Sequence, residues 1–216
     1  MELLLDAESQ IETWQEVILV YNAALKQINT KLEILNDEFQ HVHQYNPIEH
    51  IKSRLKTADS IVKKLKKDGC EVTIDNMMNH LSDIAGIRII CSFVDDIYEV
   101  AEMLVRQDDV TVIAIKDYIK NPKPNGYRSY HMIIEIPVFF SDSKKPIRVE
   151  VQIRTIAMDF WASLDHQLKY KKSFVDLNGE ISGELKQCAD VIAQTDNKML
   201  EIRKRIEAQG VTVSRD

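Results

Sequence analysis

The sequence predicts an α+β fold, in which a mixed β-sheet of about five strands is flanked by helices, with a long helix at each end. Three observations support this prediction. Apolar residues recur at helical spacing over residues 7–42 and again over residues 180–208. Between these segments, short runs of β-branched and aromatic residues are separated by further helical stretches. The 216 residues are 44% hydrophobic, which is enough to bury the core of one domain.

Composition excludes several classes of protein. The chain has 28 basic and 34 acidic residues, so bulk attraction to nucleic acid or to an anionic membrane is not expected. Its three cysteines have no paired spacing, which fits a reducing compartment better than a disulfide framework or a zinc site. The first residues do not form a signal peptide, and no apolar run approaches the length of a membrane span. We therefore expect a cytoplasmic protein with no membrane and no stable nucleic-acid partner.

The first half of the chain is predicted to be helical. Residues 7–42 contain no proline or glycine, so they form one long amphipathic helix or two close ones. A second helix is predicted over residues 46–69, because Asn46 suits the N-cap, Pro47 the first helical position and Gly69 the end.

A concentration of basic residues follows the start of this second predicted helix. Between residues 52 and 67 there are seven basic residues and one acidic residue. Helical spacing would place four polar side chains on one face: Lys56, Ser60, Lys64 and Lys67. That face is either simply solvated or a surface that binds phosphate.

Four strands and the remaining helices can be placed along the rest of the chain. The strands are predicted at residues 87–94, 110–119, 132–138 and 148–154. Helices are predicted at residues 71–82, 95–107, 155–170 and 180–208, with a polar linker at 171–179. In the helix after residue 155, Thr155 is a candidate N-cap. The apolar stripe of that helix is Ile156, Phe160, Leu164 and Leu168.

The strand at residues 148–154 and the loop that precedes its neighbour carry the densest set of polar groups. Alternation directs Arg148, Glu150, Gln152 and Arg154 to one face of the strand. A solvated face would also alternate. However, the loop at residues 121–126 carries Lys123 and leads into Tyr127 and His131. An acid, an amide, guanidinium groups, a lysine and an aromatic ring are the components of a nucleotide site.

Residue chemistry alone supports a phosphate site that binds Mg²⁺. Asp83 and Glu150 are acids next to or on predicted central strands, and Mg²⁺ prefers one or two carboxylates plus substrate phosphates. Tyr127, beside a glycine, is able to stack on a base. The groups suited to phosphate oxygens are Lys56, Lys64, Arg88 and Lys123. The chain contains neither a Walker-type loop nor a GxGxxG motif.

Several motifs resemble those of a known family. Three segments of the chain resemble motifs of the RelA/SpoT-type (p)ppGpp synthetases: Ser82–Arg88 (SDIAGIR), Asn125–His131 (NGYRSYH) and Val149–Thr155 (VEVQIRT). Residues 46–50, 117–126 and 157–166 are similar to the corresponding segments of the small, single-domain alarmone synthetases, most closely the RelP type. The resemblance runs from about Asn46 to Tyr170, and the motifs stand in the correct order. The flanking helices match only in length and character.

The resemblance implies a nucleotidyltransferase-like synthetase fold and a pyrophosphokinase activity. The β,γ-diphosphate of ATP would move to the 3′-hydroxyl of GDP or GTP and leave AMP, with Mg²⁺ as cofactor. Asp83 would hold the metal, while Glu150 would share it or act as base. The ATP-binding residues would be Arg54, Lys56, Ser60, Lys64 and Arg88. The acceptor-binding residues would be Lys123, Tyr127, His131, Gln152 and Asp159. The catalytic domain would span residues 46–171, between helical segments at 1–45 and 172–216, with no hydrolase domain.

Two departures from the family pattern stand out. Tyr130 replaces a leucine that many relatives carry, and we expect little consequence because it should face the core. Asp159 stands where the RelQ type has asparagine. This difference leaves open whether the residue contacts guanine and whether the product activates the protein.

Alternatives remain open for function and for assembly. A nucleotide- or RNA-binding regulatory module on the same scaffold is one, although simple binding does not need both Asp83 and Glu150. A nucleotidyltransferase with another acceptor is the other. The terminal helices have more apolar surface than a small sheet can cover, so we expect an oligomer. The alternative is a monomer in which both helices fold back on its own core. The resemblance implies a homotetramer. The apolar residues that we expect the core to leave uncovered are Trp14, Tyr21, Met199 and Ile202.

Overall fold

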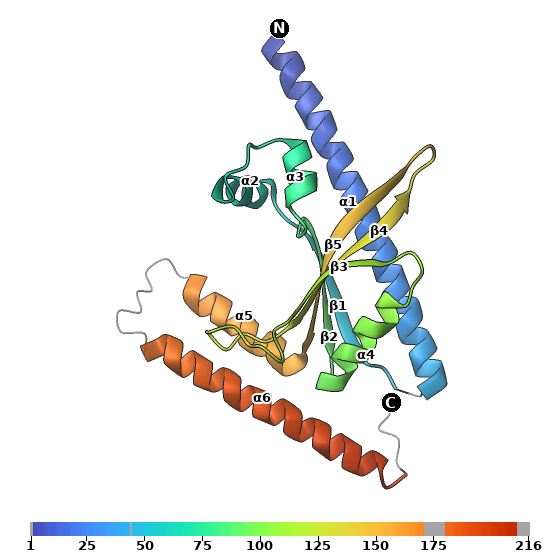
Figure 1. Ribbon diagram of the computed structural model, residues 1–216, viewed down its shortest axis with the longest axis vertical. Coiled ribbons are helices and arrows are strands. Elements are labelled where there is room, and N and C mark those ends of the chain that lie inside the picture. The colour runs from blue at the N-terminus through green and yellow to red at the C-terminus, as the bar shows by residue number, and fades with distance from the viewer. Residues whose placement is uncertain (1, 44, 171–179, 211–216) are drawn as a thin grey trace.

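The computed structural model describes residues 2–43, 45–170 and 180–210, and it confirms the predicted fold class (Figure 1). The strands are β1 (Ile48–Leu55), β2 (Ala85–Cys91), β3 (Thr111–Asp117), β4 (Tyr130–Phe139) and β5 (Lys144–Thr155). The helices are α1 (Glu2–His43), α2 (Ala58–Lys67), α3 (Ile74–His80), α4 (Val94–Val105), α5 (Ile156–Tyr170) and α6 (Glu180–Glu207). Within the described ranges, no helix is both long and apolar enough to cross a membrane.

The strands form one mixed sheet in the order β1-β2-β5-β4-β3. Only the central pair, β2 and β5, is parallel, and the other pairs are antiparallel. In this register Gly86 lies between Arg54 on β1 and Glu150 on β5. In the next row, Arg88 lies between Lys52 on β1 and Gln152 on β5, and Gln152 pairs with His131 on β4. Residues distant in sequence are thus aligned in two rows across the sheet.

One face of the sheet is the hydrophobic core and the other is polar. Helices α1 and α4 pack on the first face, on the right of Figure 1. The inward residues Val149, Val151 and Ile153 of β5 are fully buried there, together with Ile28 and Leu32 of α1. Burying apolar surface on this face contributes most of the stabilisation. The alternation of β5 therefore directs its polar side chains to the opposite face.

The predicted helix over residues 46–69 is wrong in its first half. Residues 48–55 form the edge strand β1, which pairs with β2 from Ile48–Cys91 to Leu55–Ala85. This ladder provides backbone hydrogen bonds that a local start signal does not reveal, so tertiary pairing overrides propensity. Helix α2 begins only at Ala58, after Thr57, whose side chain accepts a hydrogen bond from the Ser60 backbone. Lys56 therefore precedes the helix and does not share a helical face with Ser60 and Lys64.

The apolar stripe predicted for α5 faces outward. Ile156, Phe160 and Leu168 are each more than half exposed, whereas Met158 and Trp161 are buried. The Thr155 hydroxyl accepts a hydrogen bond from the Met158 backbone at 3.1 Å, so the predicted cap is present.

Of the four apolar residues predicted to be left uncovered on the terminal helices, two are exposed and two pack in or against the core. Tyr21 is buried and Trp14 is partly buried against the core, so neither is surplus. Met199 and Ile202 on α6 are exposed, as predicted. The predicted linker at 171–179 lies outside the described residues.

Candidate active site

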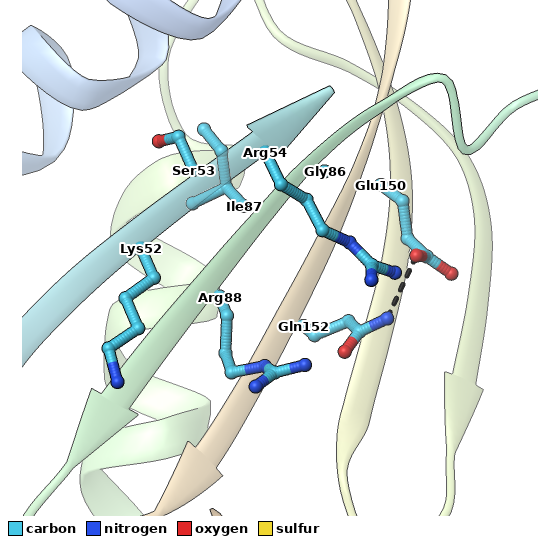
Figure 2. A pocket seen from close by; sticks show the side chains of 8 residues that line it. All are labelled: Lys52, Ser53, Arg54, Gly86, Ile87, Arg88, Glu150 and Gln152. Atoms are coloured by element: carbon cyan, nitrogen blue, oxygen red, sulfur yellow. Dashed lines mark hydrogen bonds between the residues drawn. The ribbon is translucent and has the colours of Figure 1, made fainter. Parts of the chain in front are cut away.

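The polar face of the sheet is hollowed into two adjoining cavities. The first, of about 310 Å³, lies over β1, β2 and β5 (Figure 2). Its lining residues are Lys52, Ser53, Arg54, Gly86, Ile87, Arg88, Glu150 and Gln152. The second, of about 460 Å³, shares Arg54, Arg88 and Gln152 and extends to α5. The residues that it adds are Arg154, Ala162, Ser163, His166 and Gln167.

Gly86 opens the first cavity. It lies on β2 between Arg54 and Glu150, and a Cβ atom there would be 3.7 Å from the Arg54 side chain. A larger side chain would therefore fill the space between the guanidinium group and the carboxylate. Figure 2 shows Arg54, Arg88, Gln152 and Glu150 converging around this space.

Asp83 lies just before β2 and faces two lysines. Lys56 Nζ is 2.5 Å from Asp83 Oδ2, and Lys64 Nζ is 2.9 Å from Oδ1. Burial raises the pKa of Asp83, but the two lysines outweigh burial and hold its pKa below the ordinary value of 3.8. Asp83 is therefore a carboxylate at neutral pH. Its Oδ1 atom is buried and is paired with the Lys64 ammonium group, so a metal ion at this oxygen would have to replace that lysine.

Ser60 lies on the first turn of α2, in the same region as Lys56 and Lys64. Its hydroxyl oxygen accepts a hydrogen bond from the Thr57 hydroxyl at 2.9 Å. Its backbone amide is also directed to the Thr57 side chain. Ser60 is thus part of the N-terminal turn of a helix that carries several lysines, a location that favours an anion.

Glu150 lies at the centre of the polar face, on β5. Gln152 Nε2 donates a hydrogen bond to its Oε2 atom at 2.8 Å, and His131 Nδ1 is 3.6 Å from its Oε1 atom. Burial raises the pKa of Glu150, but His131 and Gln152 more than offset burial and leave the pKa below its ordinary value. Glu150 is therefore ionised and held in a fixed orientation.

Two carboxylates without a third metal-binding side chain suit Mg²⁺. In the described part of the chain, no group of three or more His, Cys, Asp or Glu residues is placed to hold a metal ion. Mg²⁺ needs only one or two carboxylates, because nucleotide phosphates and water supply the other ligands. Asp83 is near enough for its charge to raise the pKa of Glu150. The arrangement fits a magnesium ion that enters with a nucleotide.

Aromatic side chains gather beside Glu150, in the segment that leads into β4. The Tyr127 hydroxyl is 2.8 Å from His131 Nε2, and His131 packs edge-on against Tyr118. Lys123 Nζ lies 4.9 Å from the centre of the Tyr127 ring and 4.7 Å from that of Tyr118. This cluster combines flat rings with a cation, which is suited to a base and its phosphates.

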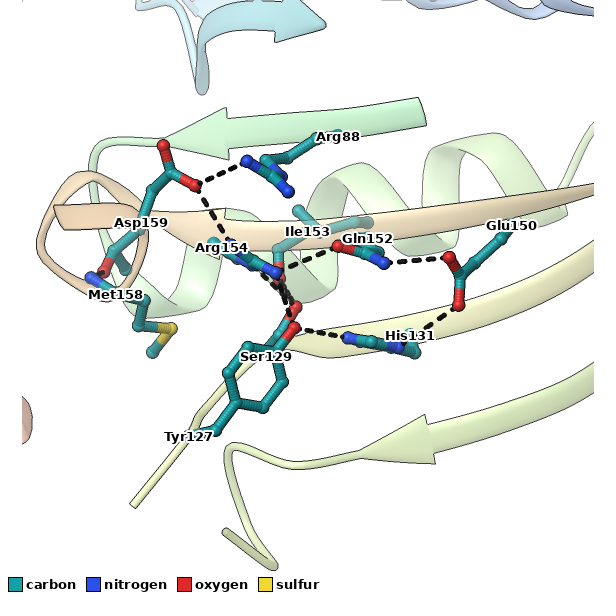
Figure 3. Close-up of polar contacts among 11 residues, drawn as sticks. Arg88, Tyr127, Ser129, His131, Glu150, Gln152, Ile153, Arg154, Met158 and Asp159 are labelled. Atoms are coloured by element: carbon teal, nitrogen blue, oxygen red, sulfur yellow. Dashed lines mark hydrogen bonds and ion pairs between the residues drawn. The ribbon is translucent and has the colours of Figure 1, made fainter. Parts of the chain in front are cut away.

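Arg154 connects this cluster to the second cavity. It is only 4% exposed, and its guanidinium group contacts Tyr127, Gln152 and Asp159 (Figure 3). The distances are 2.5 Å to the Tyr127 hydroxyl, 2.9 Å to Gln152 Oε1 and 3.0 Å to Asp159 Oδ1. The same Asp159 oxygen is 3.3 Å from Arg88. A continuous line of polar contacts therefore runs from Arg88 to Glu150.

All the residues predicted for the site lie on or beside the polar face, in three groups. Asp83, Lys56, Ser60 and Lys64 form one group, before β2 and on or just before α2. Arg54, Arg88, Glu150 and Gln152 line the first cavity. Lys123, Tyr127, His131 and Asp159 belong to the third group, with Arg154 at its centre. Sequence reasoning gave Arg154 no role of its own, although strand alternation had already placed it on the face of Glu150.

Comparisons with known proteins agree with this geometry. Residues 53–174 match the family described as a region found in RelA / SpoT proteins. The chain is 47% identical over 202 residues to the GTP pyrophosphokinase YwaC of Bacillus subtilis, covering 94% of this chain and 96% of the relative. Its structure is similar to small alarmone synthetase 1 of B. subtilis bound to its product pppGpp. The TM-score is 0.80 at 34% identity, covering 90% of this chain and 98% of the other. The same synthetase bound to AMPCPP gives a TM-score of 0.75 at 31% identity, covering 91% and 99%.

Proposed function

Because the chain belongs to the RelA/SpoT family, we propose that it is a GTP pyrophosphokinase of the small alarmone synthetase type. It transfers the β,γ-diphosphate of ATP to the 3′-hydroxyl of GDP or GTP, forms ppGpp or pppGpp and releases AMP. The observation that carries this proposal is the position of Glu150 between a cavity bordered by Arg54 and Arg88 and the aromatic cluster of Tyr127. The Glu150 carboxylate thus lies between two places that are each suited to a nucleotide.

The first cavity and the start of α2 are suited to ATP. Arg54 and Arg88 border both cavities, and each has a planar guanidinium group able to stack on adenine. Burial is the main cause that lowers the pKa of Arg88, and the positive charges of Arg154 and then Arg54 lower it further. An anion bound between Arg54 and Arg88 would relieve their repulsion. Lys56 lies just before α2, Ser60 on its first turn and Lys64 in its last turn, and both lysines contact Asp83. Together these side chains would bind the phosphates.

The segment at residues 121–129, here named the acceptor loop, is suited to the guanine nucleotide. Tyr127 presents a ring for stacking on guanine, and Lys123 lies against that ring, where it is able to reach phosphate oxygens. His131 and Gln152 lie between the loop and Glu150. Asp159 belongs with this site because it orients Arg154, which holds the Tyr127 hydroxyl.

Transfer between two polyanions is mainly a problem of positioning and of charge. Mg²⁺ bound by Asp83 and Glu150 would supply charge stabilisation for the transferred diphosphate. Lys56 and Lys64, which neutralise Asp83 in the free protein, would be available to phosphate if a metal ion were bound at that carboxylate. Glu150, ionised and oriented by Gln152 and His131, either shares the metal or accepts the proton of the attacking 3′-hydroxyl.

Two rival functions make different predictions for the same residues. A regulatory module that only binds nucleotide or RNA would tolerate loss of Glu150, and an RNA-binding module would show little response to Mg²⁺. A nucleotidyltransferase with another acceptor would not require guanine on Tyr127. We propose synthesis only, in the cytoplasm, by the catalytic segment 46–171 between the terminal helical segments 1–45 and 172–216.

We also propose a homotetramer. The outward stripe of α5, which consists of Ile156, Phe160, Leu164 and Leu168, is apolar and exposed. Exposed apolar residues on α6 add to it: Val191, Met199, Ile202 and Ile206. Surfaces of this kind are usually covered by another protein chain, and closed symmetric assemblies are the common solution.

The function is tested by incubating the protein with ATP labelled on its γ-phosphate, Mg²⁺ and either GDP or GTP. The expected result is a labelled guanosine tetra- or pentaphosphate together with an equal amount of AMP. Product that forms without guanine nucleotide, or label released as free phosphate, would contradict the assignment. The Glu102→Gln variant, altered at an exposed ion pair on α4, serves as a matched control that should behave like the wild type.

A further inference from the structure

The acceptor loop packs directly against α6, a helix that contributes no residue to the proposed substrate sites. Gly126 is buried, with a backbone φ of 88°, in the left-handed region that favours glycine. A Cβ atom at this position would lie 2.7 Å from Ala189 Cβ and 3.3 Å from Lys186 Cα. The loop and the helix are therefore in contact at a point where only glycine fits.

Arg128 fastens the loop to the same part of α6. Its guanidinium group donates hydrogen bonds to the carbonyl oxygens of Gly126 at 3.1 Å and Ala189 at 3.3 Å. It also forms an ion pair with Asp190 at 3.0 Å. One side chain thus joins the loop backbone, the helix backbone and a helix carboxylate. Arg128 immediately follows Tyr127, so any displacement of this contact moves the proposed guanine-stacking ring.

The loop has an internal structure that transmits this contact to Lys123. The Gly126 amide donates to the Lys123 carbonyl at 2.8 Å, and the Lys123 amide donates to the Tyr127 carbonyl at 3.1 Å. These two hydrogen bonds close a tight turn whose ends carry the proposed acceptor-binding side chains. Fixing Gly126 and Arg128 therefore fixes the relative position of Lys123 and Tyr127.

Helix α6 is itself attached to the rest of the molecule by contacts that do not involve the loop. The Trp161 indole donates to the Leu185 carbonyl at 2.8 Å, and the Thr155 hydroxyl donates to Asp196 at 2.6 Å. Near its other end, Arg203 binds Asp96 at 2.9 Å. The helix is thus held by α5, β5 and α4 as well as by the loop.

We propose that α6 is a positioning element of the acceptor site, acting through the Gly126–Ala189 contact and the Arg128–Asp190 ion pair, here named the α6 clamp. The clamp presets the acceptor loop for the guanine nucleotide and leaves the ATP site unaffected. This inference rests on the proposed function for the identity of the acceptor. The restraint that α6 places on the loop stands on the geometry alone.

Two variants loosen the clamp from opposite sides. Asp190→Ala removes the helix carboxylate, and alanine keeps the helix intact. Gly126→Ala introduces the Cβ atom that α6 does not accommodate. Asp190→Ala is expected to raise the KM for GDP about three- to fivefold, because the carboxylate of this ion pair is partly exposed. Gly126→Ala is expected to raise it at least as much, because its Cβ atom would displace the loop from Ala189. The KM for ATP and kcat at saturating GDP should stay near the wild-type values. Glu201→Gln, which alters an exposed ion pair elsewhere on α6, is the matched control.

Hydrogen exchange of the loop amides provides a readout that does not depend on activity. The amides of residues 121–129 should exchange faster in both variants than in wild type and Glu201→Gln, without any nucleotide present. Unchanged exchange in Asp190→Ala, or equal losses of GDP and ATP affinity by calorimetry, would overturn the clamp. A wild-type protein that makes no (p)ppGpp would instead overturn the proposed function, and the loop exchange would still decide the clamp. Asp190 is on the helix surface, so this variant is expected to fold even if Gly126→Ala does not.

Discussion

Glu150 is the residue for which charge and orientation matter most. Glu150→Gln should keep the fold and the binding of both nucleotides but reduce kcat on the order of a hundredfold or more, because the amide neither binds Mg²⁺ well nor accepts a proton. Steady-state kinetics checks this, with nucleotide affinities measured by calorimetry. Glu135→Gln is the matched control, since Glu135 lies on the neighbouring strand and pairs with Arg148.

The pH dependence of the reaction gives a second readout of Glu150. Its pKa in the folded protein lies below the ordinary value of 4.5, and the ionised form is the one that acts. Activity that depends on Glu150 is therefore present above that value and is lost as the pH falls through the lowered pKa. An acid limb of kcat/KM near pH 6 would belong to another group. Turnover close to wild type in Glu150→Gln would remove the residue from the mechanism.

Tyr127 separates the two nucleotides at the level of a single ring. Tyr127→Ala should raise the KM for the guanine nucleotide about 5- to 150-fold, because stacking contributes roughly 1–3 kcal/mol per base. Tyr127→Phe keeps the ring but loses the hydroxyl contacts with Arg154 and His131, so its effect should be smaller. Steady-state kinetics, with the ATP and GDP concentrations varied in turn, measures the two KM values of each variant. An equal loss of ATP affinity would assign the loop to the wrong nucleotide.

At this scale the sequence predicted the components of the site well, but not how they are connected. Strand alternation alone directed Glu150, Gln152 and Arg154 to one face, because a pleated strand has no other choice. The role of Arg154 could not be predicted, since it depends on Tyr127, which is 27 residues away, and on Asp159 on the next helix. Such contacts follow from tertiary packing rather than from spacing.

At the scale of elements, the strongest periodic signals were reliable and the edge strand was not. The long helices α1 and α6 and the strands β2 to β5 lie where the apolar pattern placed them. Strand β1 was mistaken for a helix because Asn46 and Pro47 are good helix starters and because an edge strand needs only one partner. The α5 stripe was assigned correctly as apolar, but its direction depends on which side α6 occupies.

Helix α6 is expected to contribute strongly to stability through Arg203. This side chain compensates Asp96, which is fully buried, and it also contacts Asp95, Tyr45 and Phe93. Arg203→Ala should lower the free energy of unfolding by about 3 kcal/mol, because it leaves a buried charge unpaired. Lys204→Ala, at an exposed ion pair with Asp95, should cost less than about 1 kcal/mol. Urea denaturation of both variants measures the difference, and equal effects would refute it.

At the scale of the whole molecule, the proposed assembly follows from exposed apolar surface. Light scattering should give a mass near four times the 25.0 kDa of one chain. Phe160→Glu places a charge in the outward stripe of α5 and should lower the mass without unfolding the chain, because Phe160 is not part of the core. Exposed Ile113→Glu on the edge strand β3 is the control for a charge added elsewhere. A wild-type mass near 25.0 kDa at micromolar concentration would exclude the tetramer.

The order of elements along the chain has a consequence for how the protein is made. The acceptor loop lies ahead of α6, and every strand of the sheet is complete before α6 begins. A chain emerging from the ribosome therefore gains both carboxylates and its ATP-facing cations before it gains the helix that braces the guanine-binding ring. Until α6 has been translated and docked, the nascent chain has the full chemistry of the reaction but a loosely held acceptor. Unfinished chains would therefore bind the guanine nucleotide more weakly than the finished protein.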